Sequence, residues 1–462
     1  MEVFSDKLSL ISERGQYRVG ARYRSVWVAF QGRVFKSAKM AYPTTALSKL
    51  VRPYWEVKTL PKGELDEERV LIDLEDIEDR HGRIRKERSV SSIGSDKIVF
   101  GDCDILFSKL RPYLGKVVIN DPKKDYIGTT ELLPFKVRDG VNVNYVKYLM
   151  LSEDFLGMAT RMMYGKEHPR VDAGDLLSLI VPNPPPHVQD DIVETLEAQV
   201  ESKVDRLKTG LVPLQDAIEE SFVDNGVKEA SGESQSFKTY LSRFSSFGSQ
   251  RFVRCGARYR HFWDVSEGKV IENSSFALDR FGTLANMIVP ETLARGELES
   301  EYIEVDLPDI IPLEGRLTKE ERLVSSIGSD KVVFGDADIL YSQIDPFLGH
   351  VILNDRSKPY IGTTELIPLK AREGVDFRYL RYLLLSRDFL EVSQNLMYGK
   401  RHPRIHYLDV LNMRVPCPEL KTQKKVSDEI WGVEASNIER NKEIDSLYSQ
   451  VEPILLANLT SR

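Results

Sequence analysis

A short basic motif occurs twice in this chain. Residues 163–170 read MYGKEHPR and residues 397–404 read MYGKRHPR. Proline stiffens each turn, lysine and arginine can bind phosphates, and arginine can also hydrogen-bond to guanine edges. We therefore expect two rigid loops that contact nucleic acid through Lys166, His168 and Arg170 in the first copy and Lys400, Arg401, His402 and Arg404 in the second. The alternative is that the glycine ends a helix and the arginine pairs with a nearby carboxylate.

A second basic segment mixes cations with aromatic residues near the N-terminus. Residues 1–60 hold eleven Lys or Arg against four acidic residues. Alone, this segment is equally compatible with a solvated basic face, but part of it returns around residue 258, which favours nucleic-acid binding. The residues that we expect to contact DNA are Arg22, Tyr23, Arg24, Arg33, Lys36 and Lys39, and in the second copy Arg258, Tyr259 and Arg260.

Three enzymatic interpretations do not fit the sequence. The stretch NPPP (183–186) resembles the NPP-aromatic motif of amino-methyltransferases, but Pro186 replaces the aromatic residue that stacks on a flipped base. Carboxylates that could bind a nuclease metal lack the Glu-x-Lys that such a site uses. Histidines at metal spacing and a phosphate-binding glycine loop are also missing. We expect no catalytic residue and no metal in this chain; the carboxylates considered are Asp102, Asp104, Glu131, Asp336, Asp338 and Glu365.

The repetition extends over a whole domain. Between 91–137 and 325–371, 31 of 47 positions are identical, and GARYR occurs at both 20–24 and 256–260. The period is far too long for a solenoid, so a domain of roughly 180 residues has been copied in tandem. Within the conserved part, Lys109 becomes Gln343 and Arg111 becomes Asp345. These changed positions join the predicted DNA-contacting set, which then includes Lys109, Arg111 and Gln343.

Each copy is predicted to have a mixed α/β fold. Short segments such as 97–100, 101–108 and 115–119 alternate apolar and polar residues between Gly and Pro, as strands do. Residues 144–163 have helical spacing, and the helix should end at Gly165, with a counterpart over 377–397 that ends at Gly399. The fold class is therefore α/β (α+β), with this domain duplicated and each copy followed by a long helix.

Long apolar stripes follow both copies. Apolar residues recur every three or four positions over 189–224 and over about 423–460, which favours two helices that pack on each other as an antiparallel coiled coil. Gly210 and Pro213 should kink the first helix, and Asn437 and Asn441, near the middle of the second stripe, can fix its register. Two ordinary bundle helices are the alternative. The stripe residues that we expect to bind a partner are Leu196, Val200, Leu207, Leu214, Ile430, Leu447 and Val451.

Composition agrees with a soluble cytoplasmic protein. The chain has 462 residues, three widely spaced cysteines and a net charge of −7. No apolar run approaches a membrane span, and the first ten residues carry acids and lack the continuous apolar core of a signal peptide. The charge is unevenly distributed: residues 1–60 carry +7, whereas residues 186–224 carry −7. A basic lobe therefore adjoins an acidic segment, and the acidic segment would repel DNA.

The ordered set of duplicated motifs resembles the specificity subunit of type I restriction–modification systems. The residues that carry the resemblance are GDCDILFSKLRPYLGKV (101–117) and GDADILYSQIDPFLGHV (335–351). They are similar to the family's Gly-Asp strand with its Ser, Pro and Gly-Lys. The stretch from Gly165 to Gln189 is similar to the family's approach to its spacer helix.

The resemblance implies a division of labour among subunits in a prokaryotic cytoplasm. This chain would be a non-catalytic reader of double-stranded DNA. It would dock methyltransferase subunits, two by expectation, which bind S-adenosylmethionine, and translocase–nuclease subunits would join them. The implied domains are 1–186 (first target-recognition domain), 187–228 (central spacer helix), 229–420 (second target-recognition domain) and 421–462 (C-terminal spacer helix).

The similarity of the two copies adds an expectation about the DNA. Similar readers related by a pseudo-two-fold axis should read related half-sites as an inverted repeat, and the helices should set the gap between them. Residues 25–60 and their counterparts diverge most, so we expect differences in base preference to arise there. A stand-alone DNA-binding regulator or an antirestriction decoy remains the alternative.

Overall fold

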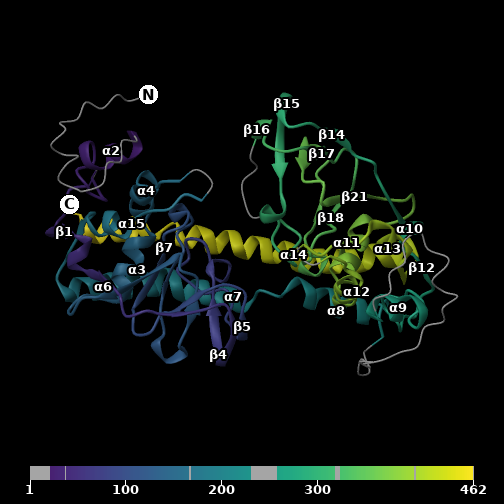
Figure 1. The fold of residues 1–462 in the computed structure, drawn as a ribbon, viewed down its shortest axis with the longest axis horizontal. Coiled ribbons are helices and arrows are strands. Elements are labelled where there is room, and N and C mark those ends of the chain that lie inside the picture. Colours follow the sequence, from purple (N-terminus) through teal and green to yellow (C-terminus); the bar gives the residue numbers. More distant parts are fainter. Residues whose placement is uncertain are drawn as a thin grey trace. The chain divides into compact units, whose positions relative to one another are not determined.

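The computed structural model describes residues 21–36, 38–165, 168–229, 257–317, 323–399 and 402–460. The chain divides into two compact units, and Figure 1 labels their elements. Unit 1 comprises residues 1–210 and 440–462, and unit 2 comprises residues 211–439. Among the described residues, no helix is both long and apolar enough to span a bilayer.

The two units contain the same three sheets in the same strand order, which confirms the predicted duplication of an α/β domain. Unit 1 has the orders β2-β10-β7-β8, β3-β6-β9-β4-β5 and β1-β11. Its strands are β1 (Thr44–Ala46), β2 (Val51–Pro53), β3 (Lys58–Leu60), β4 (Gly63–Ile72), β5 (Arg88–Ile93), β6 (Lys97–Val99), β7 (Ile105–Ser108), β8 (Val117–Ile119), β9 (Ile127–Gly128), β10 (Leu132–Val137) and β11 (Ile180–Pro182).

Unit 2 repeats these sheets strand for strand. The orders are β13-β21-β18-β19, β14-β17-β20-β15-β16 and β12-β22. The strands are β12 (Leu278–Arg280), β13 (Ala285–Met287), β14 (Glu291–Leu293), β15 (Gly296–Val305), β16 (Leu323–Ile327), β17 (Lys331–Val333), β18 (Ile339–Ser342), β19 (Val351–Leu353), β20 (Tyr360–Gly362), β21 (Leu366–Ala371) and β22 (Arg414–Pro416).

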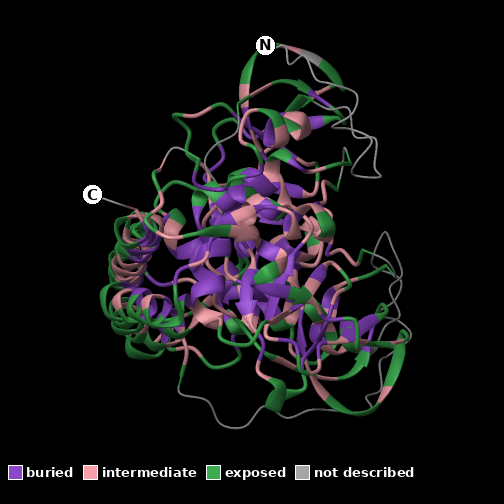
Figure 2. Cartoon of the chain, turned by 90° about the vertical axis from the view of Figure 1, so that its left-hand side faces the viewer, coloured by how far each residue is buried: buried purple, intermediate pink, exposed green. Residues whose placement is uncertain are grey.

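The central strand β7 explains why the Asp-Ile-Leu-Phe-Ser stretch is so apolar. All four of its residues are buried, because helices cover one face and a second sheet covers the other. Phe107 meets Phe155 of a helix edge-on, with 6.0 Å between ring centroids. Leu106 points the other way, into the cluster that contains Ile72 and Phe100. Figure 2 shows such buried residues (purple) gathered inside, with exposed residues (green) on the outer helical faces.

A close backbone approach fixes one glycine in each repeat. Strand β9 pairs in parallel with β4, and a Cβ at Gly128 would collide with the carbonyl oxygen of Ile72. Gly362 meets the same obstacle at the carbonyl of Val305. The repeated YIGTTE stretch thus owes its glycine to sheet packing rather than to a ligand.

The helix predicted over 144–163 is two helices, which corrects the expected single one. They are α3 (Val143–Leu151) and α4 (Glu153–Arg161), separated by Ser152. Ser152 has an extended backbone (ψ 146°), and its hydroxyl accepts a hydrogen bond from the Phe155 amide, which is N-cap geometry. Ser386 divides α11 (Phe377–Leu385) from α12 (Arg387–Leu396) in the same way. The remaining helices of the two domains are α2 (Ala21–Val28), α5 (Ala173–Leu177), α9 (Ala257–Asp264), α10 (Phe281–Leu284) and α13 (Tyr407–Asn412).

The predicted central helix is also interrupted. It consists of α6 (Pro186–Leu196), a π-helical turn η5 (Glu197–Glu201), α7 (Ser202–Thr209) and α8 (Leu214–Asp224). The gap between α7 and α8 contains Gly210 and Pro213, so the predicted kink is a complete break. The C-terminal stripe forms α14 (Leu420–Tyr448) and α15 (Val451–Leu459).

Antiparallel contacts join these helices within each unit. In unit 1, Tyr448 donates to Glu201 (3.2 Å) and Arg440 donates to the carbonyl of Gly210. In unit 2, the side-chain amide of Asn437 binds both backbone groups of Val212 (2.6 and 3.2 Å). Asn437 therefore satisfies polar groups that the break leaves without helical partners, which is the register-fixing role expected of a polar residue in the stripe.

A buried carboxylate fastens the spacer helix to the domain in both units. In unit 2, Glu434 of α14 accepts two hydrogen bonds from Arg381 (2.7 and 2.8 Å) and one from Tyr382 (3.0 Å). The side chain of Arg381 is 1% exposed. In unit 1, the corresponding Glu201 lies 3.6 Å from Lys147 and accepts from Tyr148 (3.0 Å).

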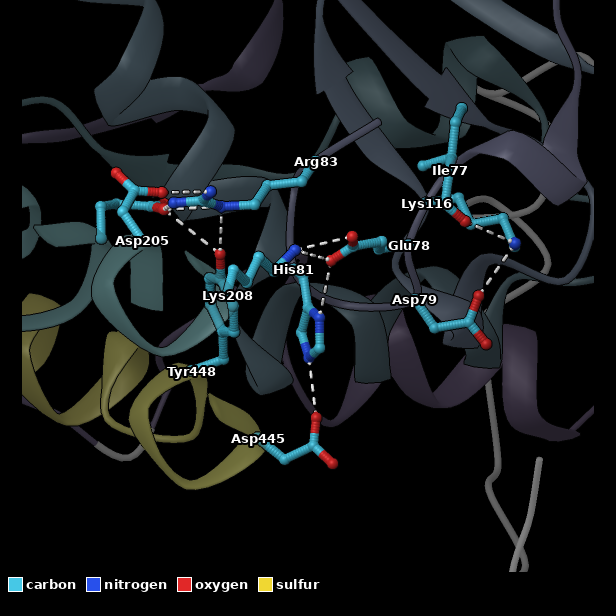
Figure 3. A network of polar contacts seen from close by, with 11 residues as sticks. Ile77, Glu78, Asp79, His81, Arg83, Lys116, Asp205, Lys208, Asp445 and Tyr448 are labelled. Atoms are coloured by element: carbon cyan, nitrogen blue, oxygen red, sulfur yellow. Dashed lines mark hydrogen bonds and ion pairs between the residues drawn. The ribbon is translucent and has the colours of Figure 1, made fainter. Parts of the chain in front are cut away.

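A wider polar network continues from Glu201. Arg83 donates to Glu201 (3.0 Å) and to Asp205 (2.6 Å), and Figure 3 shows Arg83 beside Asp205. His81 bridges Glu78 (3.1 Å) and Asp445 (2.9 Å) and stacks on Tyr448. Burial alone would lower the pKa of His81, but the hydrogen bonds to Asp445 and Glu78 outweigh it and raise that pKa. The network ties the loop after β4 to α7 and the end of α14.

The two anchors should respond differently to loss of the carboxylate charge. Glu434→Gln leaves the Arg381 guanidinium buried without an anion, and we expect unit 2 to lose about 3–5 kcal/mol of unfolding free energy. Glu201→Gln should cost unit 1 only about 1–2 kcal/mol, because Arg83 keeps Asp205 and burial already lowers the pKa of Lys147. Native-state hydrogen exchange resolves the two units separately. An equal or larger loss for Glu201→Gln would contradict this assignment.

Candidate nucleic-acid interface

The first basic loop is closed by its own backbone. The amides and carbonyls of Tyr164 and Arg170 bond to each other (2.9 and 2.8 Å). The loop is also joined to the segment after β7, because the Arg111 amide donates to Pro169 (2.9 Å) and the Val171 amide donates to Lys109 (2.9 Å). Gly165 has φ +92°, a conformation that side-chain-bearing residues rarely adopt. Lys166 lies outside the described residues.

An ion pair between Arg170 and Glu131, called the brace below, stabilises this loop. The guanidinium of Arg170 donates from Nε and Nη2 to the two oxygens of Glu131 (2.9 and 2.8 Å) and from Nη1 to the His168 carbonyl (3.1 Å). The hydrogen bond from Arg170 lowers the pKa of Glu131. Arg170 is therefore engaged with a carboxylate, which is the alternative noted for this motif. It holds the loop in place through this ion pair.

The second repeat keeps the same architecture. Tyr398 and Arg404 exchange backbone hydrogen bonds (both 2.9 Å), and Arg404 Nε donates to Glu365 (2.9 Å). The Asp345 amide donates to Pro403 (2.9 Å), as Arg111 does to Pro169. Lys400 and Arg401 lie outside the described residues. The brace is thus a shared part of the scaffold, with His168 and His402 exposed on the two loops.

Most of the acidic residues considered for a metal form other interactions. Asp104 accepts from Lys136 (2.7 Å) and from the Val137 amide (2.7 Å), and Glu131 forms the brace. No group of three or more potential metal ligands is found in the described part of the chain. Cys103 and Cys417 are free thiols, and Cys255 is not among the described residues.

The other predicted DNA-contacting residues differ widely in exposure. The structure leaves Arg22, Arg33, Lys36, Lys39 and Arg258 exposed. Tyr23, Arg24, Lys109, Arg111 and Gln343 are half-buried. Lys36 also donates to the Ala29 carbonyl and lies over the Phe30 ring.

Two predicted contacts are buried and belong to the core. Tyr259 is 7% exposed and its hydroxyl donates to Asp409 (3.1 Å). Arg260 is 4% exposed and pairs with Asp264 (2.9 Å). These side chains fasten α9 within unit 2, where DNA cannot reach them. Tyr23 has the equivalent bond to Asp175 in unit 1 (2.9 Å).

The repeats differ in charge around the braced loops. Arg111 (φ +48°) and Asp345 (φ +43°) have the same left-handed backbone and precede matching 3₁₀ turns, η3 (Pro112–Leu114) and η8 (Pro346–Leu348). Lys109 acts electrostatically on Glu131, whereas Asp345 acts on Arg404. One scaffold therefore presents added positive charge in unit 1 and added negative charge in unit 2.

A third substitution between the repeats is internal. Lys116 donates to the carbonyls of Leu74 (2.6 Å) and Ile77 (2.9 Å) and pairs with Asp79 (2.9 Å). In the second repeat the lysine is His350, whose pKa is lowered by burial. This position stabilises a turn and offers no contact for DNA.

The stripe residues expected to bind a partner serve the chain's own core. Six of them are 7% exposed or less, and Leu207 is half-buried. The outward face of α6, η5 and α7 is rich in carboxylates. The exposed acids there are Asp190, Asp191, Glu194, Glu197 and Asp205.

Sequence reasoning weighed Glu131 and Glu365 as metal ligands, rejected that role and did not identify another one. In the structure each is the anion of a loop brace. One sequence signal for this ion pair was available. Both repeats contain the same Thr-Thr-Glu stretch, and both contain the loop arginine that pairs with its glutamate. The partner across 39 residues could be identified only from the fold.

Comparison with solved structures gives 12 similar chains, of which three are named below. One is from a type I R-M system, in work on complex assembly and conformational transition: 17% identity, 92% of this chain and 99% of that chain covered, TM-score 0.38. The second is the HsdS subunit from Thermoanaerobacter tengcongensis, with 17% identity, 91% of this chain and 96% of that chain covered, and a TM-score of 0.32. The third is the type I restriction–modification S subunit from M. genitalium, with 12% identity, 92% of this chain and 97% of that chain covered, and a TM-score of 0.37. No protein-family model and no curated sequence matches the chain.

The brace should govern the local order of its loop. Glu131→Gln removes the charge and one acceptor from Arg170, so we expect the amides of Tyr164 and Arg170 to exchange with deuterium faster. The equivalent Glu365→Gln should affect the loop at 397–404 alone. Each variant is the control for the other in one hydrogen-exchange experiment. Unchanged exchange in both loops would show that the backbone ladder suffices without the ion pair.

Proposed function

We propose that this chain is the DNA-recognition subunit of a type I restriction–modification complex. The observation that carries the proposal is the duplication of a braced basic loop on two matching scaffolds within one chain. Two copies of a reader suit a DNA site that is split into two halves. Because the scaffolds match, the half-sites should be related and inverted with respect to each other.

The reading surface follows from the geometry. In each unit, backbone bonds and the Arg–Glu brace fix the ends of the loop, and the exposed histidine lies beside the fixed end. The neighbouring position, Arg111 or Asp345, differs in charge and can discriminate between bases, since arginine favours guanine and a carboxylate accepts from cytosine. Exposed cations such as Arg22, Arg33 and Lys39 would supply phosphate contacts.

The spacer helices would dock the partner subunits. Their apolar faces are buried within the chain, so docking would use the outward, acidic faces of α6, η5 and α7. An acidic face disfavours DNA and suits a protein partner. Under this proposal, two methyltransferase subunits hold S-adenosylmethionine and transfer the methyl group, translocase–nuclease subunits cleave, and this chain contributes specificity without catalysis. The protein would act in a prokaryotic cytoplasm.

Mapping methylated bases tests the role directly. Genomic DNA is sequenced by long reads after expression of the chain alone, its methyltransferase partner alone, and both together. We expect methylation at a split motif with related, inverted halves only when both proteins are present. Absence of methylation with a verified active partner would favour a stand-alone DNA-binding regulator or decoy. Methylation by this chain alone would contradict its non-catalytic role.

A further inference from the structure

Unit 1 contains an arginine-lined groove beside the turn η3. Its volume is about 430 Å³, and it is lined by Arg22, Arg80, Tyr113, Glu153, Leu156, Gly157, Thr160 and Arg161. These residues come from α2, the loop after β4, η3 and α4. Three guanidinium groups thus meet one carboxylate at a single surface depression. The groove adjoins the braced loop through η3, whose N-cap is Arg111.

One arginine is held in place by the protein. Arg80 has a left-handed backbone (φ +61°), and its Nε and Nη2 donate to the Tyr113 carbonyl (3.3 and 3.2 Å). Its Nη1 pairs with Glu153. The charge of Arg80 is therefore compensated, and its side chain forms a fixed wall of the groove.

The other two arginines have no carboxylate partner in the described part of the chain. Arg161 donates to the Ser25 hydroxyl (3.4 Å), and its guanidinium lies 4.9 Å from the centre of the Phe30 ring. These contacts orient Arg161 without neutralising it. Arg22 is exposed at the start of α2, and none of its side-chain atoms forms a hydrogen bond or ion pair with a described residue. Two uncompensated cations therefore share one groove.

Such an arrangement suits a phosphate group. Guanidinium groups bind phosphate oxygens through paired, charge-assisted hydrogen bonds. Like-charged side chains also repel each other, so an anion between them relieves a cost that the free protein bears. A neutral ligand would not provide that relief.

The second repeat carries less positive charge at the groove's positions. Aligned by the repeat, Arg22 corresponds to Arg258, but Arg80 and Arg161 correspond to Leu313 and Asn395. Leu313 keeps the left-handed backbone of Arg80 (φ +63°), so the scaffold is retained while these two cations are lost. Glu153 becomes Arg387, which pairs with Asp216, and Gly157 becomes Glu391.

We propose that this groove binds a phosphodiester of the DNA backbone next to the half-site read by the first repeat, and that the second repeat has no equivalent site. The inference rests on the proposed function and deepens it. The two readers share a scaffold for base recognition but hold the backbone unequally. Unit 1 supplies more of the salt-dependent affinity, and the first half-site is held more firmly at low salt.

The salt dependence of binding tests the groove. Affinity of the full chain for a mixed-sequence DNA duplex is measured by fluorescence anisotropy over a series of salt concentrations. The logarithm of the association constant falls as the logarithm of the salt concentration rises. Arg22→Ala should reduce the steepness of this fall by about 1, the effect of losing one phosphate contact. Arg22→Glu should reduce the steepness further. The matched variant Arg258→Ala, at the same position of the second repeat, should change the slope much less.

A gain-of-charge variant completes the design. Leu313→Arg combined with Asn395→Arg restores the two missing arginines in unit 2 and should make the salt dependence of binding steeper. Equal effects of Arg22→Ala and Arg258→Ala, or no effect of either, would overturn the groove while leaving DNA recognition intact. A wild-type chain that shows no salt-dependent DNA binding, alone or with its methyltransferase partner, would overturn the proposed function itself.

Discussion

The burial of each repeat's last helix in the other repeat's unit is the constraint on which this structure depends. In unit 1, α15 comes from the end of the second repeat and packs against α3 and α6, with Leu455 and Leu459 fully buried. In unit 2, α8 comes from the end of the first repeat and places Ile218 and Phe222 in the main core. Neither repeat therefore completes its hydrophobic core from its own residues.

The two spacer segments pass between the units differently. The first is interrupted between α7 and α8, where it leaves unit 1 for unit 2, whereas α14 runs from unit 2 into unit 1 as one helix. Gly210 and Pro213 lie in the interruption, and Asn437 satisfies the backbone of Val212 there. The buried carboxylates Glu201 and Glu434 then fix each helix to its domain.

The sequence revealed the duplication, the α/β class and the spacer helices, because those features lie in local patterns and in repeats. Identical stretches expose duplication directly, and a three-to-four spacing marks a helix without knowledge of its partner. Asn437 could be recognised because a polar residue inside an apolar stripe is conspicuous.

Pairings between distant residues were not predictable in the same way. Arg170 is engaged by Glu131, and Arg260 lies in the core against Asp264. In each case the sequence shows a cation, and only the fold decides whether it faces solvent or a carboxylate. The packing of α8 and α15 in the unit of the other repeat was also not predictable, because an apolar stripe indicates that a helix is buried but not which domain buries it.

Hydrogen–deuterium exchange measured on variants of α15 tests most directly whether this helix of the second repeat completes the core of unit 1. Leu455→Asp with Leu459→Asp places two charges on the buried face of α15, and Ala457→Asp with Asn458→Asp on its exposed face is the control. If α15 completes unit 1, the first variant loses protection in α3 and α6 of the first repeat, whereas α11 of the second repeat stays protected. Loss of protection in α11 with α3 and α6 unchanged would contradict the account.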